Sequence, residues 1–306
     1  MALTYDQISA ITEKSFIKKL ADNIFDSNPL TMRLKKKSLE LLDGGTSIIQ
    51  PLNYAQVSSA GWYSGAETLN TADNDVITGA EYSWKQFYAN ISISRIDELK
   101  NSGDKAILNF VKEKVKIAEK TMVDNLGTGI YSAGSDPKSI VGLRSMIAVS
   151  GTFAGISQTD NSWWRGQVDS ATTTLTLAAM QSLHNLCSID NDKPSVVATT
   201  RSIYNLYYAL LQPQQRFMDS ETAKGGFQNL LFNGIPVIAD SHCPASNMFF
   251  LNEDYLHLYV HKDENMRFEP FMKPINQNVK VAKIYWAGAF GSSNNRLHGK
   301  LSAISA

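Results

Sequence analysis

Residues 104–127, DKAILNFVKEKVKIAEKTMVDNLG, limit the choice of fold more than any other segment of this chain. Apolar residues recur there every three or four positions: Ile107, Val111, Val115, Ala118, Met122 and Leu126. That spacing places them on one stripe of an α-helix. Asp104 suits the positive end of the helix dipole, and Gly127 is predicted to end the helix. The segment therefore predicts a rod about 35 Å long with one apolar face.

The opposite face of this rod is rich in lysine. The lysines outside the apolar stripe are Lys105, Lys112, Lys114, Lys116 and Lys120. Glu113 and Glu119 moderate their charge, so one reading is a face turned to water. The other reading is a face turned toward a polyanion, and the pattern alone leaves both open.

Residues 46–94 are predicted to form a long β-hairpin. SIIQPLNYAQV leads outward and YSWKQFYANISIS returns, with an apolar residue at every second position from Phe87 to Ile93. About 25 residues separate these strands, too many for a tight turn, and a structureless loop of that length usually has a function or is disordered. A two-stranded ribbon is only marginally stable in water, so we expect it to lie on another surface.

The loop of this hairpin contains the motif GWYSG, with Trp62 and Tyr63 at its centre. Nothing close in the sequence could bury these two side chains. Exposed aromatic residues on a protrusion indicate a contact with another molecule.

The first residues predict an amphipathic arm. Thr4 and Gln7 have the spacing of a capping box. The apolar residues that recur at helical intervals after it are Ile8, Ile11, Phe16, Ile17, Leu20 and Ile24. Asn28 and Pro29 are predicted to end this helix. The segment that follows is not compact in character, so the arm has no obvious core of its own to cover.

From about residue 176 the pattern changes to alternating helices and strands. LTLAAMQSLHNLCSI and RSIYNLYYALLQ predict helices, KPSVVATT predicts a strand, and FQNLLFNGIPVIAD predicts a strand broken by a turn. MFFLNEDYLHLYVHKDENMRFEPF predicts two or three short strands, and VKVAKIYWAGAFGSSNNRLHGKLSAI predicts a closing pair around a Gly/Ser/Asn turn. This half of the chain therefore predicts compact mixed α/β layers.

Charge and hydropathy exclude some classes of protein. Lysine plus arginine and aspartate plus glutamate both number 29, so no overall field draws the chain onto nucleic acid or an anionic membrane. No apolar run approaches the roughly 18 to 20 residues that cross a bilayer, and the N-terminal sequence has no signal-peptide pattern. We expect a chain made and kept in the cytosol, with no membrane contact. Cys187 and Cys243 are expected to be reduced and buried.

Catalytic and metal-binding signatures are absent from the sequence, which has no GxSxG, GxxxxGK, GxGxxG or HExxH motif. His242 directly precedes Cys243, but neighbours in an extended segment point to opposite sides. His257 and His261 have the spacing of a metal pair on a helix, yet the alternation around them predicts a strand, where they would lie roughly 13 Å apart. We expect no catalytic residue, no cofactor and no metal site.

Trp163, Trp164 and Arg165 stand together in the polar connector AGISQTDNSWWRGQVDS, residues 154–170. They could pack between layers of this chain, contact a neighbouring subunit, or offer a platform to a sugar or nucleobase. A platform would be favoured by repeated polar-aromatic segments or a basic surround, and neither is present.

The order of these parts resembles the major capsid proteins of tailed bacteriophages, which have the Hong Kong 97 phage fold. The similar segments are GTGIYSAGSDPKSIVGL after the rod, GISQTDNSWWR, and LLFNGIPVIADSHCP followed by MFFLNEDYLHLYV. The resemblance spans the whole chain, and its specificity lies in the order of the segments. It implies an α+β capsid fold with an N-terminal arm, an extended β-hairpin loop, a long spine helix, a peripheral domain and an α/β axial domain.

The resemblance also implies boundaries and partners. The arm would comprise residues 1–45, the extended loop 46–94, the peripheral domain with the spine helix 95–175, the axial domain 176–264, and the return strands of the peripheral domain 265–306. Copies of the chain would assemble through pentamers and hexamers into an icosahedral or prolate shell around double-stranded DNA. The expected location is the virion, assembled in the host bacterial cytoplasm, with separate scaffolding, portal and decoration proteins as further partners.

Residue roles follow from the same resemblance. The subunit interface would include Ile8, Ile11, Phe16, Leu20, Trp62, Tyr63, Trp163, Trp164 and Arg165. Lys112, Lys116 and Lys120 of the spine helix would face the packaged DNA. Residues 58–80 contain no lysine, so a lysine-to-asparagine crosslink from that loop is not expected.

Three other functions share parts of this pattern. Encapsulin nanocompartments share the architecture, because a fold does not fix a role. A glycan-binding module would use Trp62, Trp163 and Trp164. An enzyme would use Cys243 or the histidines.

Overall fold

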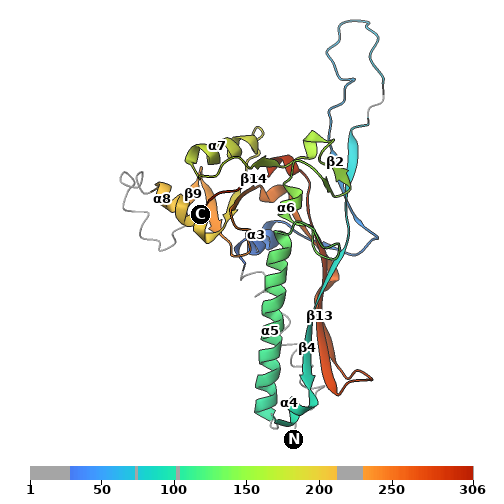
Figure 1. Ribbon diagram of the computed structural model, residues 1–306. Coiled ribbons are helices and arrows are strands. Elements are labelled where there is room, and N and C mark those ends of the chain that lie inside the picture. Colours follow the sequence, from blue (N-terminus) through green and yellow to red (C-terminus); the bar gives the residue numbers. More distant parts are fainter. Residues whose placement is uncertain (1–27, 73–74, 101–103, 212–229, 306) are drawn as a thin grey trace.

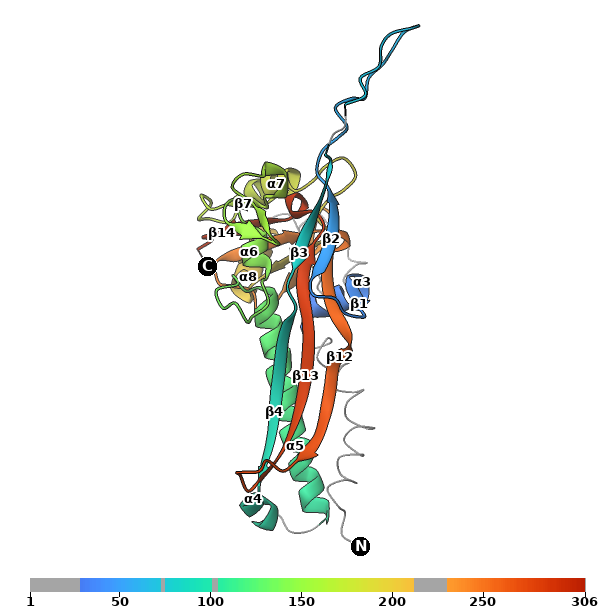
Figure 2. The ribbon, with the colours of Figure 1, turned by 90° about the vertical axis from the view of Figure 1, so that its right-hand side faces the viewer.

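The computed structural model describes residues 28–72, 75–100, 104–211 and 230–305. The arm residues Ile8, Ile11, Phe16 and Leu20 lie outside this part of the chain. A long β-sheet and a long helix run side by side along one axis, and a second α/β unit packs beside their upper end (Figures 1 and 2). A loop projects from the top of the molecule.

A four-stranded sheet forms the long axis, in the order β1-β12-β13-β4. Its strands are β1 (Leu39–Leu42), β12 (Leu256–Met272), β13 (Val279–Ser292) and β4 (Lys85–Ser94). β12 is antiparallel to β13, and β13 is antiparallel to β4, whereas β1 runs parallel to β12. Alternate residues of β4, namely Ala89, Ile91 and Ile93, are buried, which gives the sheet an apolar face.

Helix α5 (Asp104–Ile130) lies along this face, in contact with β4. The predicted stripe is confirmed, since its described members are at most 6% exposed: Val111, Val115, Ala118, Met122 and Leu126. The predicted end at Gly127 is wrong, because the helix continues to Ile130. A Cβ on Gly127 would clash with Nδ2 of Asn28 and would lie 2.7 Å from Nδ1 of His242. This glycine therefore permits a close approach within the helix instead of ending it.

A six-stranded sheet forms the second unit, in the order β7-β14-β11-β8-β10-β9. Its strands are β7 (Gln167–Asp169), β14 (Gly299–Ser302), β11 (Asn247–Leu251), β8 (Val196–Thr199), β10 (Ile235–Ala239) and β9 (Leu231–Phe232). Helices α7 (Leu177–Leu186) and α8 (Arg201–Leu211) pack on it through one apolar cluster. Thr176 caps α7, because its Oγ1 accepts a hydrogen bond from the backbone N–H of Ala179 at 3.1 Å.

Two strands lie differently from the sequence-based expectation. β12 continues without a break across the boundary predicted after residue 264, as one strand of 17 residues. β14 joins the six-stranded sheet, between β7 and β11, although residues 265–306 were predicted to return to the peripheral domain. Leu301 of β14 is fully buried in the core of that second unit. Packing of Leu301 against residues that are distant in sequence therefore places the C-terminal strand in the six-stranded sheet.

The projecting hairpin consists of β2 (Ile48–Asn53) and β3 (Ile77–Tyr82), which pair antiparallel. The returning strand of the hairpin was predicted at residues 82–94, and this pairing is wrong, because only Tyr82 belongs to β3, whereas residues 85–94 form β4 and pair with β13. The apolar face of β4 packs against α5. In a two-stranded hairpin alone that face would have remained exposed to water.

Helix α3 (Pro29–Lys37) begins where a helix was predicted to end. Pro29 stands in its first turn, where its fixed φ and missing N–H cost nothing. Leu30 and Leu34 are fully buried, and the next segment, β1, joins the long sheet. Residues 28–42 of the predicted arm therefore fold into the core of their own subunit.

Candidate assembly surfaces

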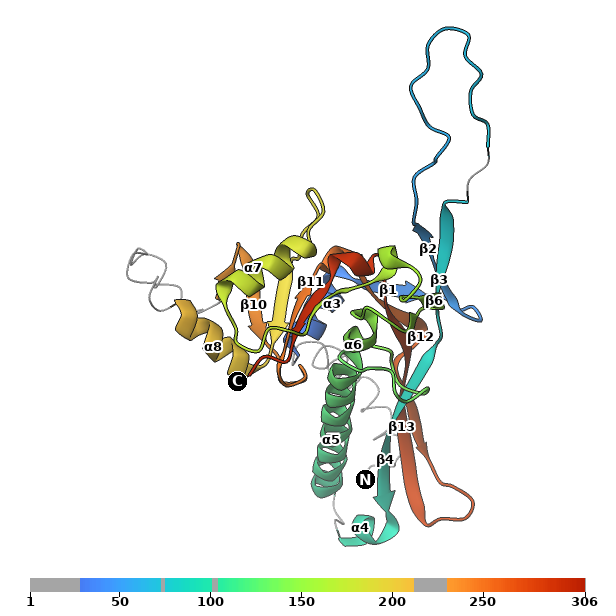
Figure 3. The ribbon, with the colours of Figure 1, turned by 45° about the horizontal axis from the view of Figure 1, so that its top comes forward.

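The described part of the loop between β2 and β3, residues 54–72 and 75–76, projects from the body in every view (Figure 3). Large apolar side chains are exposed along it: Val57 at 51%, Trp62 at 105%, Tyr63 at 68% and Leu69 at 56%. Apolar groups of this size on a protrusion are typical of a surface that contacts another molecule. The loop is therefore the first candidate surface, and it contains both residues that the sequence singled out.

The base of the loop is held by Trp163. Its ring stacks on Tyr54 with 5.3 Å between centroids and an angle of 25° between the ring planes. The hydroxyl of Tyr54 donates a hydrogen bond to the backbone oxygen of Asp75 across the hairpin, at 2.7 Å. The N–H of Glu81 donates to the oxygen of Ala154 in the neighbouring turn, at 2.9 Å. These contacts tie the base of the loop to the body.

Trp164 lies inside the subunit and is 1% exposed. Its Nε1 donates to the oxygen of Phe153 at 3.1 Å, and its ring stacks near that of Phe153. A side chain this buried offers no surface to another subunit, which corrects the interface expectation for Trp164. Arg165 is partly buried, and its guanidinium donates to the backbone oxygens of Gln158 and Thr159, so it stabilises the turn around the tryptophans.

The three tryptophans share no platform for a glycan. Trp62 is exposed on the loop, Trp163 is partly covered by Tyr54, and Trp164 is inside the core. Trp163 and Trp164 are neighbours, but their rings are tilted by 53° to one another and lie 5.7 Å apart. This arrangement fits packing between layers, the first of the readings left open by the sequence.

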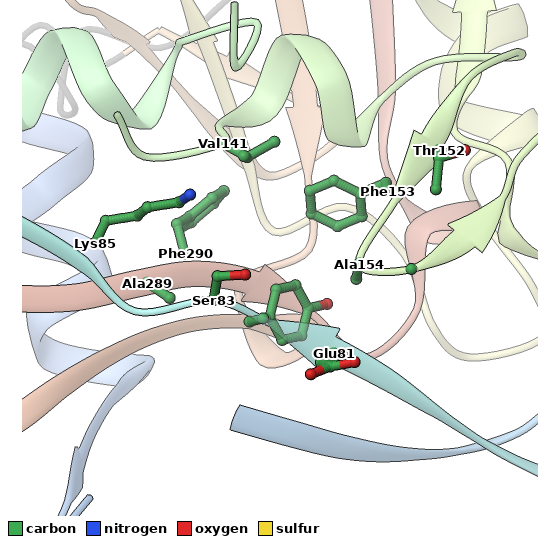
Figure 4. A pocket seen from close by; sticks show the side chains of 11 residues that line it. Glu81, Ser83, Lys85, Val141, Thr152, Phe153, Ala154, Ala289 and Phe290 are labelled. Atoms are coloured by element: carbon green, nitrogen blue, oxygen red, sulfur yellow. The ribbon is translucent and has the colours of Figure 1, made fainter. Parts of the chain in front are cut away.

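A cavity of about 190 Å³ lies beside this turn (Figure 4). Its apolar wall includes Phe153 at the end of β5 (Thr152–Phe153), just before the turn to β6 (Ile156–Ser157), together with Phe290 from β13 and Val141. Glu81 and Lys85 supply its charged groups. The volume is below the roughly 300 Å³ at which small-molecule pockets begin, so it suits a single side chain better than a substrate.

The lysine face of α5 is exposed to solvent. Lys112, Lys116 and Lys120 lie on it, next to Glu113, which is also exposed. Ile117 is 59% exposed on the same part of the helix. The structure places these lysines at the surface, and their orientation toward DNA stays a prediction.

A buried ion pair fixes α3 to the second unit. Glu253, in the short helix η4 (Glu253–Tyr255), is 1% exposed and lies 2.6 Å from Nε of Arg33 and 3.2 Å from Nζ of Lys37. The hydroxyl of Ser195 donates to the same carboxylate at 2.8 Å. Burial raises the pKa of Glu253, but the hydrogen bonds from Arg33 and Ser195, with the charges of Arg33 and Lys37, outweigh it and leave the pKa below 4.5. Arg33 and Lys37 belong to the basic run MRLKKK, residues 32–37, whereas Glu253 lies 220 residues beyond Arg33, so spacing along the chain could not pair them.

The thiols and histidines do not converge on one site. Burial raises the pKa of the Cys187 thiol to about 12, and burial together with Asp240 raises that of Cys243 well above its ordinary value. Both thiols are therefore protonated at neutral pH, and both are buried, as predicted. The imidazole of His242 lies 3.0 Å from the carboxylate of Asp124 and is not paired with Cys243.

The predicted strand around His257 and His261 is confirmed, since both residues lie on β12. His257 lies 2.7 Å from the carboxylate of Glu40, and the ring of His261 lies against that of Trp84. The sequence did not single out His298, which is fully buried, so that burial lowers its pKa to about 3 and the ring is neutral. Across the described ranges, no three histidine, cysteine or acidic side chains are grouped so that they could hold a metal ion. Nor does that part of the chain contain a helix long and apolar enough to span a membrane.

Comparison with known proteins adds to this picture. No protein-family model matches the chain, and no curated protein matches it by sequence. The capsid of cyanophage A-1(L) is similar in structure, with a TM-score of 0.64 at 18% identity over 91% of this chain and 93% of that chain. The capsid of the native GTA particle matches with a TM-score of 0.62 at 13% identity over 89% and 90%.

A shell of another kind is similar as well. The SrpI encapsulin from Synechococcus elongatus matches with a TM-score of 0.58 at 10% identity, over 89% of this chain and 86% of that chain. Each comparison covers at least 86% of both chains. The similarity therefore includes the order of the structural elements along the chain and is not limited to one domain. The chain therefore has the α+β fold of phage capsid subunits and of the encapsulin shell.

Proposed function

We propose that this chain is the major capsid protein of a tailed bacteriophage, a structural subunit that assembles into a closed shell around double-stranded DNA. The observation that carries the proposal is the exposed loop, with Trp62 and Tyr63 uncovered on a subunit whose fold is that of capsid chains over nearly its full length. Closed shells form when one surface of a subunit contacts a different surface of the next and the rotation closes. An uncovered protrusion supplies one such surface.

The assembly consists of pentamers and hexamers of this chain in an icosahedral or prolate head. Zero net charge favours dense packing, because the subunits do not repel one another. Lys112, Lys116 and Lys120 contact the packaged DNA without sequence specificity, through phosphate groups. Scaffolding, portal and decoration proteins are separate chains, and the subunit resides in the virion.

The subunit performs no catalysis in this proposal. Support comes from its buried, protonated thiols, and from the cavity beside the turn between β5 and β6, which is lined by neither a histidine nor a thiol. The change Cys243→Ser tests this directly. We expect particles of unchanged yield and appearance, whereas loss of an activity without loss of assembly would favour an enzyme.

The encapsulin likeness makes a protein compartment the second candidate. Electron microscopy of the purified recombinant protein tests the shared part of both functions, with closed particles or capsomers as the expected result. Monomers at every concentration would contradict both. Co-expression of this chain with the genes that flank its own gene distinguishes the two functions, because a capsid acquires nuclease-protected DNA and a compartment acquires a protein cargo.

A further inference from the structure

Another cavity lies at the base of the projecting loop, a groove of about 370 Å³. One wall comes from Tyr54 and β3, and the other comes from β6 and from Trp163 in the short helix η1 (Ser162–Trp164). β6 lies next to the hairpin at this level of the molecule (Figure 3). The volume falls within the range of small-molecule sites, roughly 300 to 1,000 Å³. The groove is therefore large enough to hold a ligand or one long side chain of a partner.

Most of the side-chain hydrogen-bond donors around this groove are already used within the subunit. The hydroxyl of Tyr54 donates to the backbone oxygen of Asp75, at 2.7 Å. The hydroxyl of Ser157 donates to the carboxylate of Asp160 at 2.7 Å, and Nδ2 of Asn161 donates to the backbone oxygen of Ser157 at 3.0 Å. Within the described residues, the carboxylate of Asp75 and Oδ1 of Asn161 have no hydrogen-bond partner. A ligand that complements this lining must therefore supply donors.

The charge around the groove selects among such ligands. No lysine or arginine lines it. The segment from residue 38 to residue 84 contains no basic residue, and its acidic residues are Glu40, Asp43, Glu67, Asp73, Asp75 and Glu81. Arg165 lies close in sequence to Trp163, but its guanidinium donates to the backbone oxygens of Gln158 and Thr159. A surface with this excess of carboxylates attracts cations.

Tyr54 adds an aromatic surface to the same groove. Its ring stacks on Trp163, and Trp163 in turn contacts Trp164, with 5.7 Å between those centroids. Tyr54 is the outer ring of this row, and among the described residues it has no second ring neighbour. The face of an aromatic ring attracts an ammonium ion, so Tyr54 and Asp75 favour the same kind of ligand.

We propose that this groove binds a primary ammonium group carried on an alkyl chain. The group has three N–H donors, no acceptor and a positive charge, which suit the carboxylate of Asp75 and Oδ1 of Asn161. Its methylene groups pack against the ring of Tyr54. A metal ion lacks donors, and one carboxylate is too few to hold it. The ammonium group belongs either to a free polyamine or to a lysine side chain of a partner protein.

Ligand-observed NMR titration of the full chain as dispersed subunits tests this site. Spermidine represents the free polyamine, and Nα-acetyl-lysine N-methylamide represents a lysine side chain. The same lysine derivative acetylated on Nε is the matched probe, because it keeps the chain and loses the charge. We expect it to bind at least about tenfold more weakly than the charged form. Absence of binding by both ammonium probes, or equal binding of the acetylated probe, would overturn the proposal.

Four variants separate the groove from a general attraction of cations to the loop. Asp75→Asn keeps the shape of the side chain and should weaken binding of both ammonium probes about tenfold. Glu67→Gln removes another exposed carboxylate of the loop and should change affinity by less than about twofold. Tyr54→Leu should weaken binding about threefold, whereas Tyr54→Phe retains the ring and most of the affinity. Equal effects of Asp75→Asn and Glu67→Gln would overturn the site.

Hydrogen exchange locates the bound probe. Spermidine should slow exchange of the amides in residues 75–78 and 154–161, and protection confined to other segments would contradict the groove. Tighter binding of spermidine than of the lysine derivative identifies a polyamine site, the reverse order identifies a lysine of a partner, and similar affinities support the site for both. The inference goes beyond the proposed function and needs no assembled particle, so its failure would leave the shell function intact.

Discussion

Residues 28–42 and residues 54–76 both lie in the part of the chain that was expected to find cover on other subunits, and they differ sharply. In the first segment Leu30 and Leu34 are fully buried, and Glu253 pairs with the cations of α3. In the second, Trp62 is fully exposed and no described side chain from 56 to 72 is buried. An apolar residue in this part of the sequence is therefore expected to be buried, but the sequence does not show whether its own chain or another subunit buries it.

The largest expected effect comes from removing the loop. Replacing residues 56–74 by Asn-Gly joins β2 to β3 through a tight turn and keeps Tyr54 and Asp75. The cut stops before β3, because Ala80 is fully buried. We expect a folded monomer that forms no particles, with a free energy of unfolding within about 0.5 kcal/mol of the wild type.

Analytical ultracentrifugation and urea unfolding check this result. A variant in which residues 56–74 are replaced by a flexible linker of equal length, rich in glycine and serine, separates loss of side chains from loss of length. Particles formed by either variant would contradict the role of the loop, and an unfolded chain would show that the loop belongs to the core.

An intermediate effect is expected in the buried segment. Glu253→Gln, made in the loop-deleted monomer, should lower the free energy of unfolding by about 2 kcal/mol at pH 7. The cost is below that of a fully buried pair, because the side chains of Arg33 and Lys37 are 29% and 47% exposed and can be hydrated. Urea unfolding measures it, and Glu113→Gln on the exposed face of α5 is the matched control.

The pH dependence of that variant sharpens the test. The pKa of Glu253 is lower in the folded than in the unfolded chain, whose value is near 4.5. Its stabilising contribution is therefore complete above about pH 4.5 and is lost as the pH falls through the folded pKa. The stability difference between Glu253 and the glutamine variant should shrink over that acidic range, and a constant difference would show that the charge of Glu253 is not the cause.

The smallest effect is expected at the base of the loop, where the loop joins the body of the subunit. Trp163→Ala removes the ring that stacks on Tyr54 and should cost about 1 kcal/mol of local stability. Hydrogen exchange of the β2 and β3 amides near the loop should become faster, measured below the concentration at which particles form. Trp62→Ala is the control, because this exposed ring should leave the base of the hairpin unchanged, and equal exchange in both variants would argue against a holding role for Trp163.

Local patterns predicted the regular elements of the body well. The stripe of α5 and the alternation in β4 both appear in the burial of the structure, because each depends on a period along one segment. The same reasoning failed at Gly127, where a glycine was taken as a stop. Its neighbours there are Asn28 and His242, residues distant in sequence whose approach no local pattern can show.

In the same way, the sequence did not show which strands pair with one another. Residues 82–94 were predicted to be one strand of the hairpin, but residues 85–94 form a strand that pairs with β13 and not with the hairpin. The candidate surfaces follow this division, since Trp62 and Tyr63 could be named from the sequence, whereas the stacking of Trp163 on Tyr54 and the burial of Trp164 could not.

The sequence alone was enough to establish the long helix with its single apolar face, the long uncovered loop, and the absence of familiar catalytic motifs, because these depend on residue type and short-range spacing. The three-dimensional fold was needed to place Arg33 and Lys37 on Glu253, to move the last strand into the six-stranded sheet, and to bury Trp164. Those features come from contacts between residues far apart in the chain, and their energies depend on burial and distance in space, which spacing along the sequence does not encode.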